Sequence, residues 1–268
     1  MRLNIGIAGL GTIGVPVARA LDEGIPGLAL VAVASGRREV AQQRLAAAGI
    51  SVPVVSVAEL ARMADVVVEC APARAFRSIA EPVLAAGRLL VTVSGAALLD
   101  APDLVAHAQK HGGRIILVTG ALLGLDAVRA AAEGEIRFIR MISRKPPRSL
   151  RGAPHLEKTG IDLDAITEAT CIFRGSAGDG ARGFPANVNV AAALSLAGIG
   201  PDKTELQIWA DPGVARNTHT IEVEAESARF SMTIENVPSP ENPATGRITP
   251  LSIIAALRSL GATLRVGT

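Results

Sequence analysis

Aromatic residues are scarce in this chain, which has no tyrosine, one tryptophan and five phenylalanines among 268 residues. Sites that bind single-stranded nucleic acid stack bases on such rings, so the shortage argues against a site of this kind. Positive charge is not concentrated either, because 27 lysines and arginines are scattered among 25 acidic residues. The chain therefore lacks the basic stripe that follows a phosphate backbone, and we expect no nucleic-acid partner.

Cysteine is equally sparse, since Cys70 and Cys171 are the two in the chain and lie far apart. They provide neither a disulfide framework nor metal-ligand spacing, so we expect two buried thiols and no metal site. The sequence also has no apolar run long enough to cross a bilayer, and its first residues pass directly into a strand pattern without a leader-like segment. We expect a cytoplasmic protein with no membrane partner.

Aliphatic residues, in contrast, are plentiful, and hydrophobic residues make up 49% of the chain. Between residues 4 and 119, short runs rich in Val, Ile and Leu alternate with Ala-rich stretches of helical period, as in consecutive βα units. Strands this apolar are buried on both faces, so the pattern predicts a doubly wound parallel sheet of the Rossmann type. The predicted elements include helices over 13–23, 38–48, 76–86 and 103–111 and a strand over 52–57.

The pattern changes after Gly120. Residues 135–145 and 219–236 alternate apolar with polar side chains, which is typical of antiparallel strands with one solvent-exposed face. An Ala-rich stretch between them predicts a helix over 187–196. The end of the chain predicts a helix over 251–260 and a short strand over 262–267.

We therefore expect an α/β protein of two domains. Residues 1–120 would form a Rossmann dinucleotide-binding domain, and residues 121–245 an α+β domain with an open, mostly antiparallel sheet. The C-terminal segment, 246–268, could pack back on the first domain.

A glycine motif lies between the first strand and the first helix. Gly9, Gly11 and Gly14 fit G-x-G-x-x-G, whose glycines permit a tight turn, a close approach of pyrophosphate and close helix packing. The following helix would direct its free N–H groups at the phosphates. The motif predicts a cofactor site at Gly9, Gly11, Thr12, Ile13 and Gly14, and the alternative is a tight turn that binds nothing.

The end of the second strand bears on the choice between NAD and NADP. An acidic residue that binds the ribose 2′-OH of NAD is expected there, but the sequence reads Ser35-Gly36-Arg37-Arg38. Guanidinium groups match the geometry of the 2′-phosphate of NADP. We expect Ser35, Arg37 and Arg38 to contact the cofactor and NADP to be accepted, whereas the alternative is two solvated arginines at a helix start.

One of the four histidines stands out as a candidate acid or base. His219 follows a turn that contains Asp211, Arg216 and Asn217, and it enters a predicted strand. Asp211 or Asn217 is near enough in sequence to orient its ring for proton transfer. The alternative is an ordinary histidine at a strand entry. The other three, His107, His111 and His155, are expected to be solvated.

Several long and unusual stretches carry a resemblance that runs nearly end to end. The chain resembles the L-aspartate dehydrogenase family in "GLGTIG", "TGALLGLDAVRAAAEGEI", "SRKPPRSLRG", "FRGSAGDGARGFPANVNVAAALSLAGIG", "DPGVARNTHTIEV" and "IENVPSPENPATGR". One departure is Ser143, at a position where threonine is frequent. The resemblance implies that His219 is the active-site residue, that Ala121 and Asn187 contact the nicotinamide cofactor, and that the second domain supplies catalysis and the contact of a homodimer.

The implied reaction is the NAD- or NADP-dependent oxidative deamination of L-aspartate through iminoaspartate to oxaloacetate and ammonium, and its reverse. His219 would act as general acid and base. The two carboxylates of the substrate need cationic or N–H partners in a desolvated site. The candidates for these partners are Ser94, Arg144, Lys145, Arg148 and Arg216.

Two other readings remain open at this point. Another two-domain reductase, such as a sugar dehydrogenase or a dihydrodipicolinate reductase, would share the fold. The Glu-Lys-Pro motif of the former is missing, since Arg precedes Lys145-Pro146, and the paired histidines of the latter are absent from the sequence. A non-catalytic sensor of NAD(P) is the third possibility.

Overall fold

The computed structural model describes residues 2–185, 188–242 and 245–267. The chain forms two compact units. The first contains Met1–Val118 together with Thr249–Val266, and the second contains Thr119–Ile248 with Gly267–Thr268.

The first unit is built on a six-stranded sheet of order β3-β2-β1-β4-β5-β6, in which every neighbouring pair is parallel. This confirms the predicted Rossmann sheet. The strand order reverses at β1, which is the position where such sheets bind dinucleotides. The strands are β1 (Leu3–Ala8), β2 (Leu28–Ala34), β3 (Val54–Val55), β4 (Val66–Glu69), β5 (Leu89–Thr92) and β6 (Arg114–Leu117).

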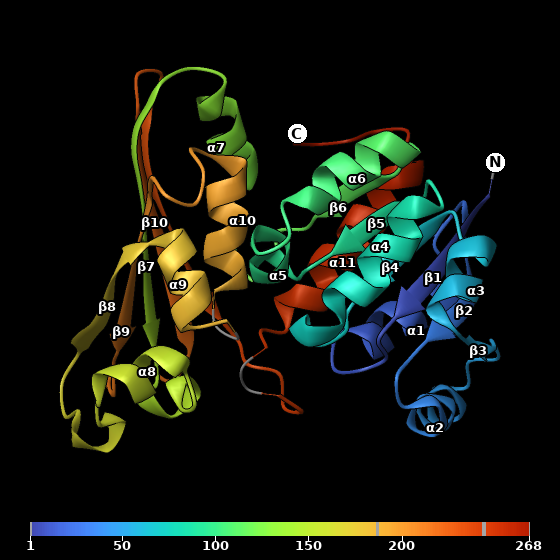
Figure 1. The fold of residues 1–268 in the computed structure, drawn as a ribbon, viewed down its shortest axis with the longest axis horizontal. Helices are drawn as coiled ribbons and strands as arrows, with labels where there is room; N and C mark the ends of the chain where they lie inside the picture. The colour runs from blue at the N-terminus through green and yellow to red at the C-terminus, as the bar shows by residue number, and fades with distance from the viewer. Residues whose placement is uncertain (1, 186–187, 243–244, 268) are drawn as a thin grey trace. The chain divides into compact units, whose positions relative to one another are not determined.

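Helices cover both faces of this sheet (Figure 1). One core contains Val17 and Leu21 of the first helix and Ile253 and Leu257 of the last, so the end of the chain completes the first unit. The helices on that face are α1 (Gly14–Gly24), α2 (Arg38–Ala48) and α11 (Ile248–Gly261). The opposite face is covered by α3 (Val57–Met63), α4 (Phe76–Ala85), α5 (Gly95–Leu99) and α6 (Asp103–His111), with the short helix η1 (Ala73–Ala75) before α4.

One predicted strand is shorter than expected, and another does not form. The strand expected over 52–57 is cut to Val54–Val55, because Ser56 caps α3 in a reciprocal capping box with Glu59. The strand expected over 262–267 does not form, and its apolar residues Leu264 and Val266 remain 79% and 94% exposed.

The second unit is built on a five-stranded sheet of order β11-β10-β7-β9-β8. Its pairs are antiparallel except for β7 with β9, which confirms the mostly antiparallel prediction. The strands are β7 (Ile136–Lys145), β8 (Thr170–Ser176), β9 (Thr204–Ala210), β10 (Asn217–Ala225) and β11 (Arg229–Asn236).

Among the residues that the structure describes, helices cover one face of this second sheet and none covers the other (Figure 1). A Cβ added to Gly180 would lie 2.4 Å from a Leu206 methyl group, so glycine lets helix α9 approach strand β9 closely. The helices of this unit are α7 (Leu125–Ala132), α8 (Pro154–Thr159), α9 (Ala177–Gly183) and α10 (Asn189–Ala197), with the short helices η2 (Pro147–Leu150) and η3 (Leu163–Ala165).

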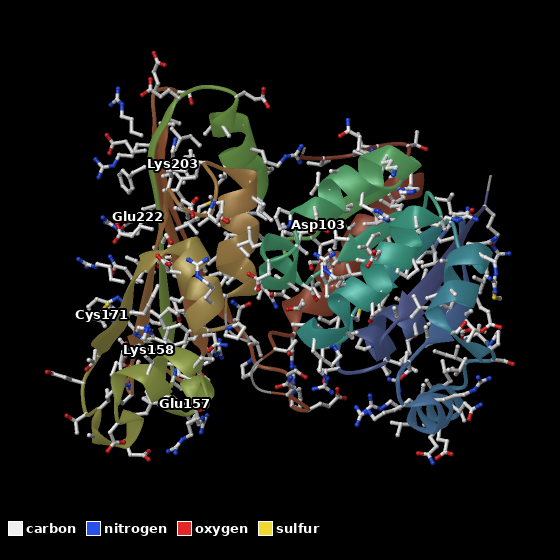
Figure 2. All side chains as sticks on the ribbon, in the orientation of Figure 1. Asp103, Glu157, Lys158, Cys171, Lys203 and Glu222 are labelled. Carbon is white, nitrogen blue, oxygen red and sulfur yellow. The ribbon has the colours of Figure 1, made fainter. Side chains whose placement is uncertain are left out.

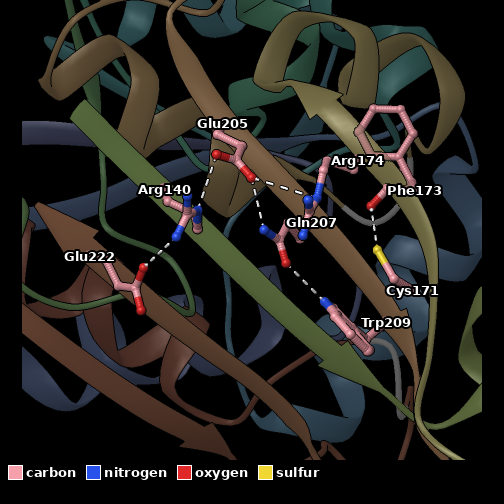
Figure 3. A network of polar contacts seen from close by, with 8 residues as sticks. All are labelled: Arg140, Cys171, Phe173, Arg174, Glu205, Gln207, Trp209 and Glu222. Carbon is pink, nitrogen blue, oxygen red and sulfur yellow. Dashed lines mark hydrogen bonds and ion pairs between the residues drawn. The ribbon is translucent and has the colours of Figure 1, made fainter.

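The other face of the sheet is open and carries a polar network. Figure 2 shows Glu222 projecting from it, and Figure 3 shows how Glu222 and Glu205 both contact Arg140. The Arg140 Nε lies 3.0 Å from Glu205 Oε2, and its Nη1 lies 3.1 Å from Glu222 Oε2. Gln207 donates to Glu205 at 2.8 Å and accepts from Trp209 at 3.1 Å. This face therefore holds its charges in pairs at the surface.

Two expectations about single residues change with this fold. His155 was expected to be solvated in a loop, but it lies on α8 and its ring is 5.3 Å from that of Phe173 and 5.2 Å from that of Phe184. The two cysteines, Cys70 and Cys171, are partly rather than fully buried as residues. Burial nevertheless raises the pKa of the Cys70 thiol well above its ordinary value.

Candidate active site

The glycine turn of the first unit is shaped by two close contacts and one opening. Gly9 has a φ of +98°, and a Cβ there would lie 2.7 Å from the backbone of Cys70 and Ala71. A Cβ on Gly14 would lie 2.1 Å from the Gly9 carbonyl oxygen. At Gly11 an added Cβ would meet nothing nearer than an Arg44 nitrogen at 4.0 Å. The bare backbone at Gly11 is thus open to a ligand, which fits the dinucleotide expected from the motif.

Positive side chains lie beside this turn. Arg44 of α2 donates a short hydrogen bond to the Leu10 carbonyl oxygen within the turn. The exposed Arg37 and Arg38 follow β2, where the Ser35 hydroxyl accepts from the Arg37 N–H at 3.2 Å. The sequence analysis missed Arg44, because its nearness to the turn depends on how α2 packs. These residues could hold phosphate groups of a dinucleotide.

A buried polar cluster lies at the ends of β4 and β5. The Glu69 carboxylate accepts from the Thr92 hydroxyl at 2.6 Å, and the Thr92 oxygen accepts from the Ser94 N–H at 2.9 Å. Ser94, a predicted substrate or cofactor contact, is only 5% exposed. Its backbone is therefore tied to a carboxylate that the sequence analysis did not single out.

The second unit places His219 on the helix-covered face of its sheet. His219 of β10 pairs in register with Ser143 of β7, and its Nδ1 lies 2.9 Å from the Ser143 Oγ. Lys145 lies two residues beyond Ser143 and so on the same face. His219, Ser143 and Lys145 are 3%, 2% and 4% exposed. Two adjacent strands thus bring three polar side chains together away from bulk water.

Burial sets the charge states of this cluster. Desolvation lowers the pKa of His219 to about 3, and the nearby charge of Lys145 adds to that effect. Desolvation also lowers the pKa of Lys145 to about 8. At neutral pH the imidazole is therefore neutral, while the lysine still carries most of its charge. A pKa of about 3 makes the ring a weak base in this state, and the negative charge of a bound substrate would raise that pKa toward the range of a general base.

Arg144 and Asp211 do not join this cluster. Side chains alternate along β7, so Arg144 lies on the open face, opposite to Ser143 and Lys145. Its Nη1 is 3.1 Å from Asp211 Oδ2, and its guanidinium is 5.2 Å from the Trp209 ring. Asp211 or Asn217 was expected to orient His219, but Ser143 lies at its Nδ1 and Asp211 is paired with Arg144. The same alternation separates Arg144 from Lys145, another candidate substrate contact.

Arg216 borders a small cavity at the same end of the sheet. The cavity has a volume of about 40 Å³, and Arg148, Ser149, Asn217 and Asn236 also line it. Asn236 donates from its Nδ2 to the Ala121 carbonyl oxygen at 3.0 Å. The structure thus ties Ala121 to the strand ends near His219, whereas Asn187 lies outside the described residues.

Two other kinds of site were considered within the part of the chain that the structure describes. Over those residues, no group of three His, Cys, Asp or Glu side chains could hold a metal ion. Over the same residues, no helix combines the length and the apolar character needed to span a membrane.

Comparisons with known proteins agree with this arrangement. The family described as "Aspartate dehydrogenase, C-terminal" matches residues 126–260, and "Homoserine dehydrogenase, NAD binding domain" matches residues 9–118. The L-aspartate dehydrogenase of Bradyrhizobium diazoefficiens is 54% identical over 99% of this chain and 94% of its own length. L-aspartate dehydrogenase 3 of Bordetella bronchiseptica is 52% identical over 99% of this chain and 98% of its own.

The fold is also shared with a solved structure. The crystal structure of aspartate dehydrogenase from Thermotoga maritima superimposes over 100% of both chains with a TM-score of 0.72 at 22% identity. Its low identity supports the fold alone, whereas the two closer relatives match the chain in sequence over nearly its full length. The chain therefore belongs to the L-aspartate dehydrogenase family, the oxidoreductases that act on a CH–NH₂ group.

Proposed function

We propose that this protein oxidises L-aspartate to iminoaspartate with NAD or NADP, and that it runs the reaction in reverse with oxaloacetate and ammonium. The buried cluster of His219, Ser143 and Lys145 is the observation that carries the proposal. The names of the close relatives support the substrate. The open backbone at Gly11 supports the cofactor.

The substrate has two carboxylates, and two cations of the second unit are suited to them. Lys145 is desolvated, so its ammonium gains more from an anion than a solvated lysine would. Arg216 borders the cavity at the same strand ends and offers a guanidinium fork to a carboxylate. Ser94 remains the candidate contact from the first unit. Arg144 is a weaker candidate, because Asp211 already neutralises it on the open face.

His219 is proposed to move the protons. Its neutral ring takes a proton from the substrate ammonium, which frees the nitrogen lone pair that forms the C=N bond as hydride leaves Cα. Bound NAD(P) supplies the hydride acceptor. After His219 has released this first proton to solvent, it takes a proton from the water that adds to iminoaspartate. Ser143 holds Nδ1, so that Nε2 is the nitrogen that serves the substrate.

The cofactor is proposed to bind along the glycine turn, with Gly9, Gly11, Thr12, Ile13 and Gly14 around its pyrophosphate. Ser35, Arg37 and Arg38 would meet the adenosine ribose, and their positive charge would favour NADP. We add Arg44 to that group, because its contact with Leu10 holds its guanidinium beside the glycine turn. Ala121 and Asn187 are proposed to contact the nicotinamide end, as the family resemblance implies.

The partner is proposed to be a second copy of the chain, in a cytoplasmic homodimer. Support comes from the family resemblance and from the open face of the second sheet, on which no helix packs in the described parts of the chain. Arg140, Glu205 and Glu222 lie on this face. Size-exclusion chromatography with light scattering would test it, and a monomeric mass would refute the dimer.

The nicotinamide absorbance band tests the reaction itself. Purified protein is supplied with oxaloacetate, ammonium and either NADH or NADPH, and a His219→Ala variant is run beside it. Oxidation that needs both co-substrates and disappears in the folded variant is the expected result, and it ranks the two nucleotides directly. If the protein binds the nucleotides but oxidises neither NADH nor NADPH, the result would refute the aspartate reaction and favour a sensor.

A further inference from the structure

Glu69 is a fully buried carboxylate at the carboxyl edge of the parallel sheet. As the last residue of β4, it pairs in register with Ala8 of β1 and with Thr92 of β5. Three strand ends therefore lie side by side where the glycine turn begins. A carboxylate at such a place has lost its water, and burial raises its pKa. Its retention in the core calls for compensating hydrogen bonds.

These hydrogen bonds come from two separate loops. Glu69 Oε1 accepts from the Ala71 N–H at 2.8 Å, and Oε2 accepts from the Thr92 hydroxyl at 2.6 Å. The Thr92 oxygen accepts in turn from the Ser94 N–H at 2.9 Å. Because a backbone N–H can only donate, the hydroxyl proton is left to point at the carboxylate. One side chain thus fixes the segments that leave β4 and β5.

The glycine turn rests on the first of these segments. An added Cβ on Gly9 would lie 2.7 Å from Ala71 N, the same nitrogen that donates to Glu69. Beyond β1 the sheet continues to β2 on one side and to β4 and β5 on the other. A dinucleotide lies across such a reversal, with one mononucleotide over each half. Arg37 and Arg38 mark the adenosine half at the end of β2, which leaves the nicotinamide half to β4 and β5.

We propose that Glu69 is a positioning residue for the nicotinamide half of the cofactor. It touches no reacting atom, but it holds the Ala71 and Ser94 backbones in the shape against which the nicotinamide ribose lies. This inference rests on the proposed binding of NAD(P) at the glycine turn. It assigns a role to a residue that neither the glycine motif nor the His219 cluster includes.

Variants of nearly equal size separate the hydrogen bonds from the packing. Glu69→Gln keeps the volume, but its NH₂ end cannot accept, so Ala71 and Thr92 cannot both donate to it. Thr92→Val removes the hydroxyl at constant shape, and Thr92→Ser restores it. Glu23→Gln, on the exposed side of α1, is the matched control. Calorimetric titration measures the dissociation constants of NADH, NADPH and ADP, which lacks both the nicotinamide and its ribose.

The expected result is selective for one half of the cofactor. Glu69→Gln and Thr92→Val weaken the binding of NADH and NADPH by about tenfold, as expected for the loss of a buried charged hydrogen bond. ADP binding stays within about twofold of wild type, and Thr92→Ser and Glu23→Gln bind all three ligands as wild type does. Circular dichroism confirms that each variant is folded. An unchanged affinity for NADH, or an equal loss for ADP, would overturn the proposal.

The titrations contain no aspartate, so they are independent of the reaction. A wild type that binds NADH but does not act on aspartate would refute the proposed function, and the Glu69 variants would still decide this inference. A wild type that turns over aspartate, beside a Glu69→Gln variant with unaltered NADH binding, would refute the inference alone. A wild type that binds no dinucleotide would refute both.

Discussion

The two faces of the five-stranded sheet carry polar side chains with different surroundings. On the covered face, His219 and Lys145 are 3% and 4% exposed. Loss of water lowers the pKa of both side chains, which favours their neutral forms. On the open face, the Arg140 and Glu205 side chains are 35% and 32% exposed. There the hydrogen bond from Gln207, followed by that from Arg140, lowers the pKa of Glu205 and favours its charge. The difference teaches that exclusion of water, rather than residue type, prepares a side chain for chemistry.

Removing the base from the covered face should have the largest effect. His219→Ala is expected to lower kcat by about a thousandfold, since general-base catalysis typically contributes 10²–10⁴-fold. Stopped-flow absorbance at the nicotinamide band would measure the change. Cofactor affinity should be kept, so NADH titration is the control. A kcat within about tenfold of wild type would mean that another group takes the proton.

Lys145 should be the next most sensitive position, and its contribution to the KM for aspartate should depend on pH. Lys145→Met is expected to raise the KM for aspartate by about a hundredfold, through loss of a desolvated charge pair. Its pKa of about 8 means that wild type loses the charge as pH rises, so the KM should increase above that pH. Lys145→Arg keeps its charge and should remove this alkaline rise. A KM profile that is the same in wild type and Lys145→Met would contradict the role.

Ser143 should act more weakly, through the orientation of His219. Ser143→Ala removes the partner of Nδ1 and is expected to lower kcat about tenfold, with little change in the KM for aspartate. Ser143→Thr keeps the hydroxyl and should restore kcat, in agreement with the threonine frequent in the family. Steady-state kinetics of Ser143→Ala and Ser143→Thr would measure these changes. If Ser143→Thr lowered kcat as much as Ser143→Ala does, the effect would come from packing rather than from the hydroxyl.

The stability of the protein should also report the burial of His219. Its pKa is lowered in the folded state, so below about pH 6.5 the unfolded chain binds a proton that the folded chain refuses. This contribution to stability is present above pH 6.5 and is lost as pH falls toward 3, by about 1.4 kcal/mol per pH unit. Urea unfolding of wild type and His219→Gln between pH 4 and 7 should show a shallower acid decline in the variant. An equal loss of stability with falling pH in wild type and His219→Gln would contradict this prediction.

The open face should give the smallest effect on the isolated chain. Arg140→Ala breaks ion pairs to Glu205 and Glu222 whose side chains are about a third exposed, so we expect at most about 1 kcal/mol lost in the free energy of unfolding. Its kcat should stay within about twofold of wild type. Thermal unfolding and steady-state assays would show this. A loss of activity comparable with that of Lys145→Met would erase the distinction between the two faces.

Much of the fold could be predicted from the sequence because it depends on local patterns. The glycine turn, the apolar strands of the first sheet and the alternation along β7 and β10 each appear within a few residues. The strand expected over 52–57 is shortened to Val54–Val55, because Ser56 and Glu59 form a capping box that starts α3. The strand over 262–267 failed because β-propensity alone does not supply a partner strand.

The site was predictable only in part, because its contacts are not local. Sequence reasoning proposed His219 as the acid or base and included Lys145 among five candidate substrate contacts, and the structure buries both side chains on one face of the sheet. It offered Asp211 or Asn217 to orient His219, although Nδ1 lies beside Ser143, 76 positions away along the chain. Glu69 and Arg44 were missed for the same reason, since a buried carboxylate and an arginine on a helix have no motif. Strand register and helix packing create these contacts, and one sequence does not reveal them.

The alternation along β7 limits how the chain can vary in length. Ser143 and Lys145 lie on the same face of β7 as the buried Ile139 and Met141, whereas Arg144 lies on the open face. One residue inserted or deleted within β7 would exchange the two sets, turning Arg144 toward the helices and Lys145 toward the surface. Related enzymes can therefore differ in this strand by substitution or by gaps of two residues. A gap of one residue would remove Lys145 from the covered face and so abolish activity, although the composition of the strand would hardly change.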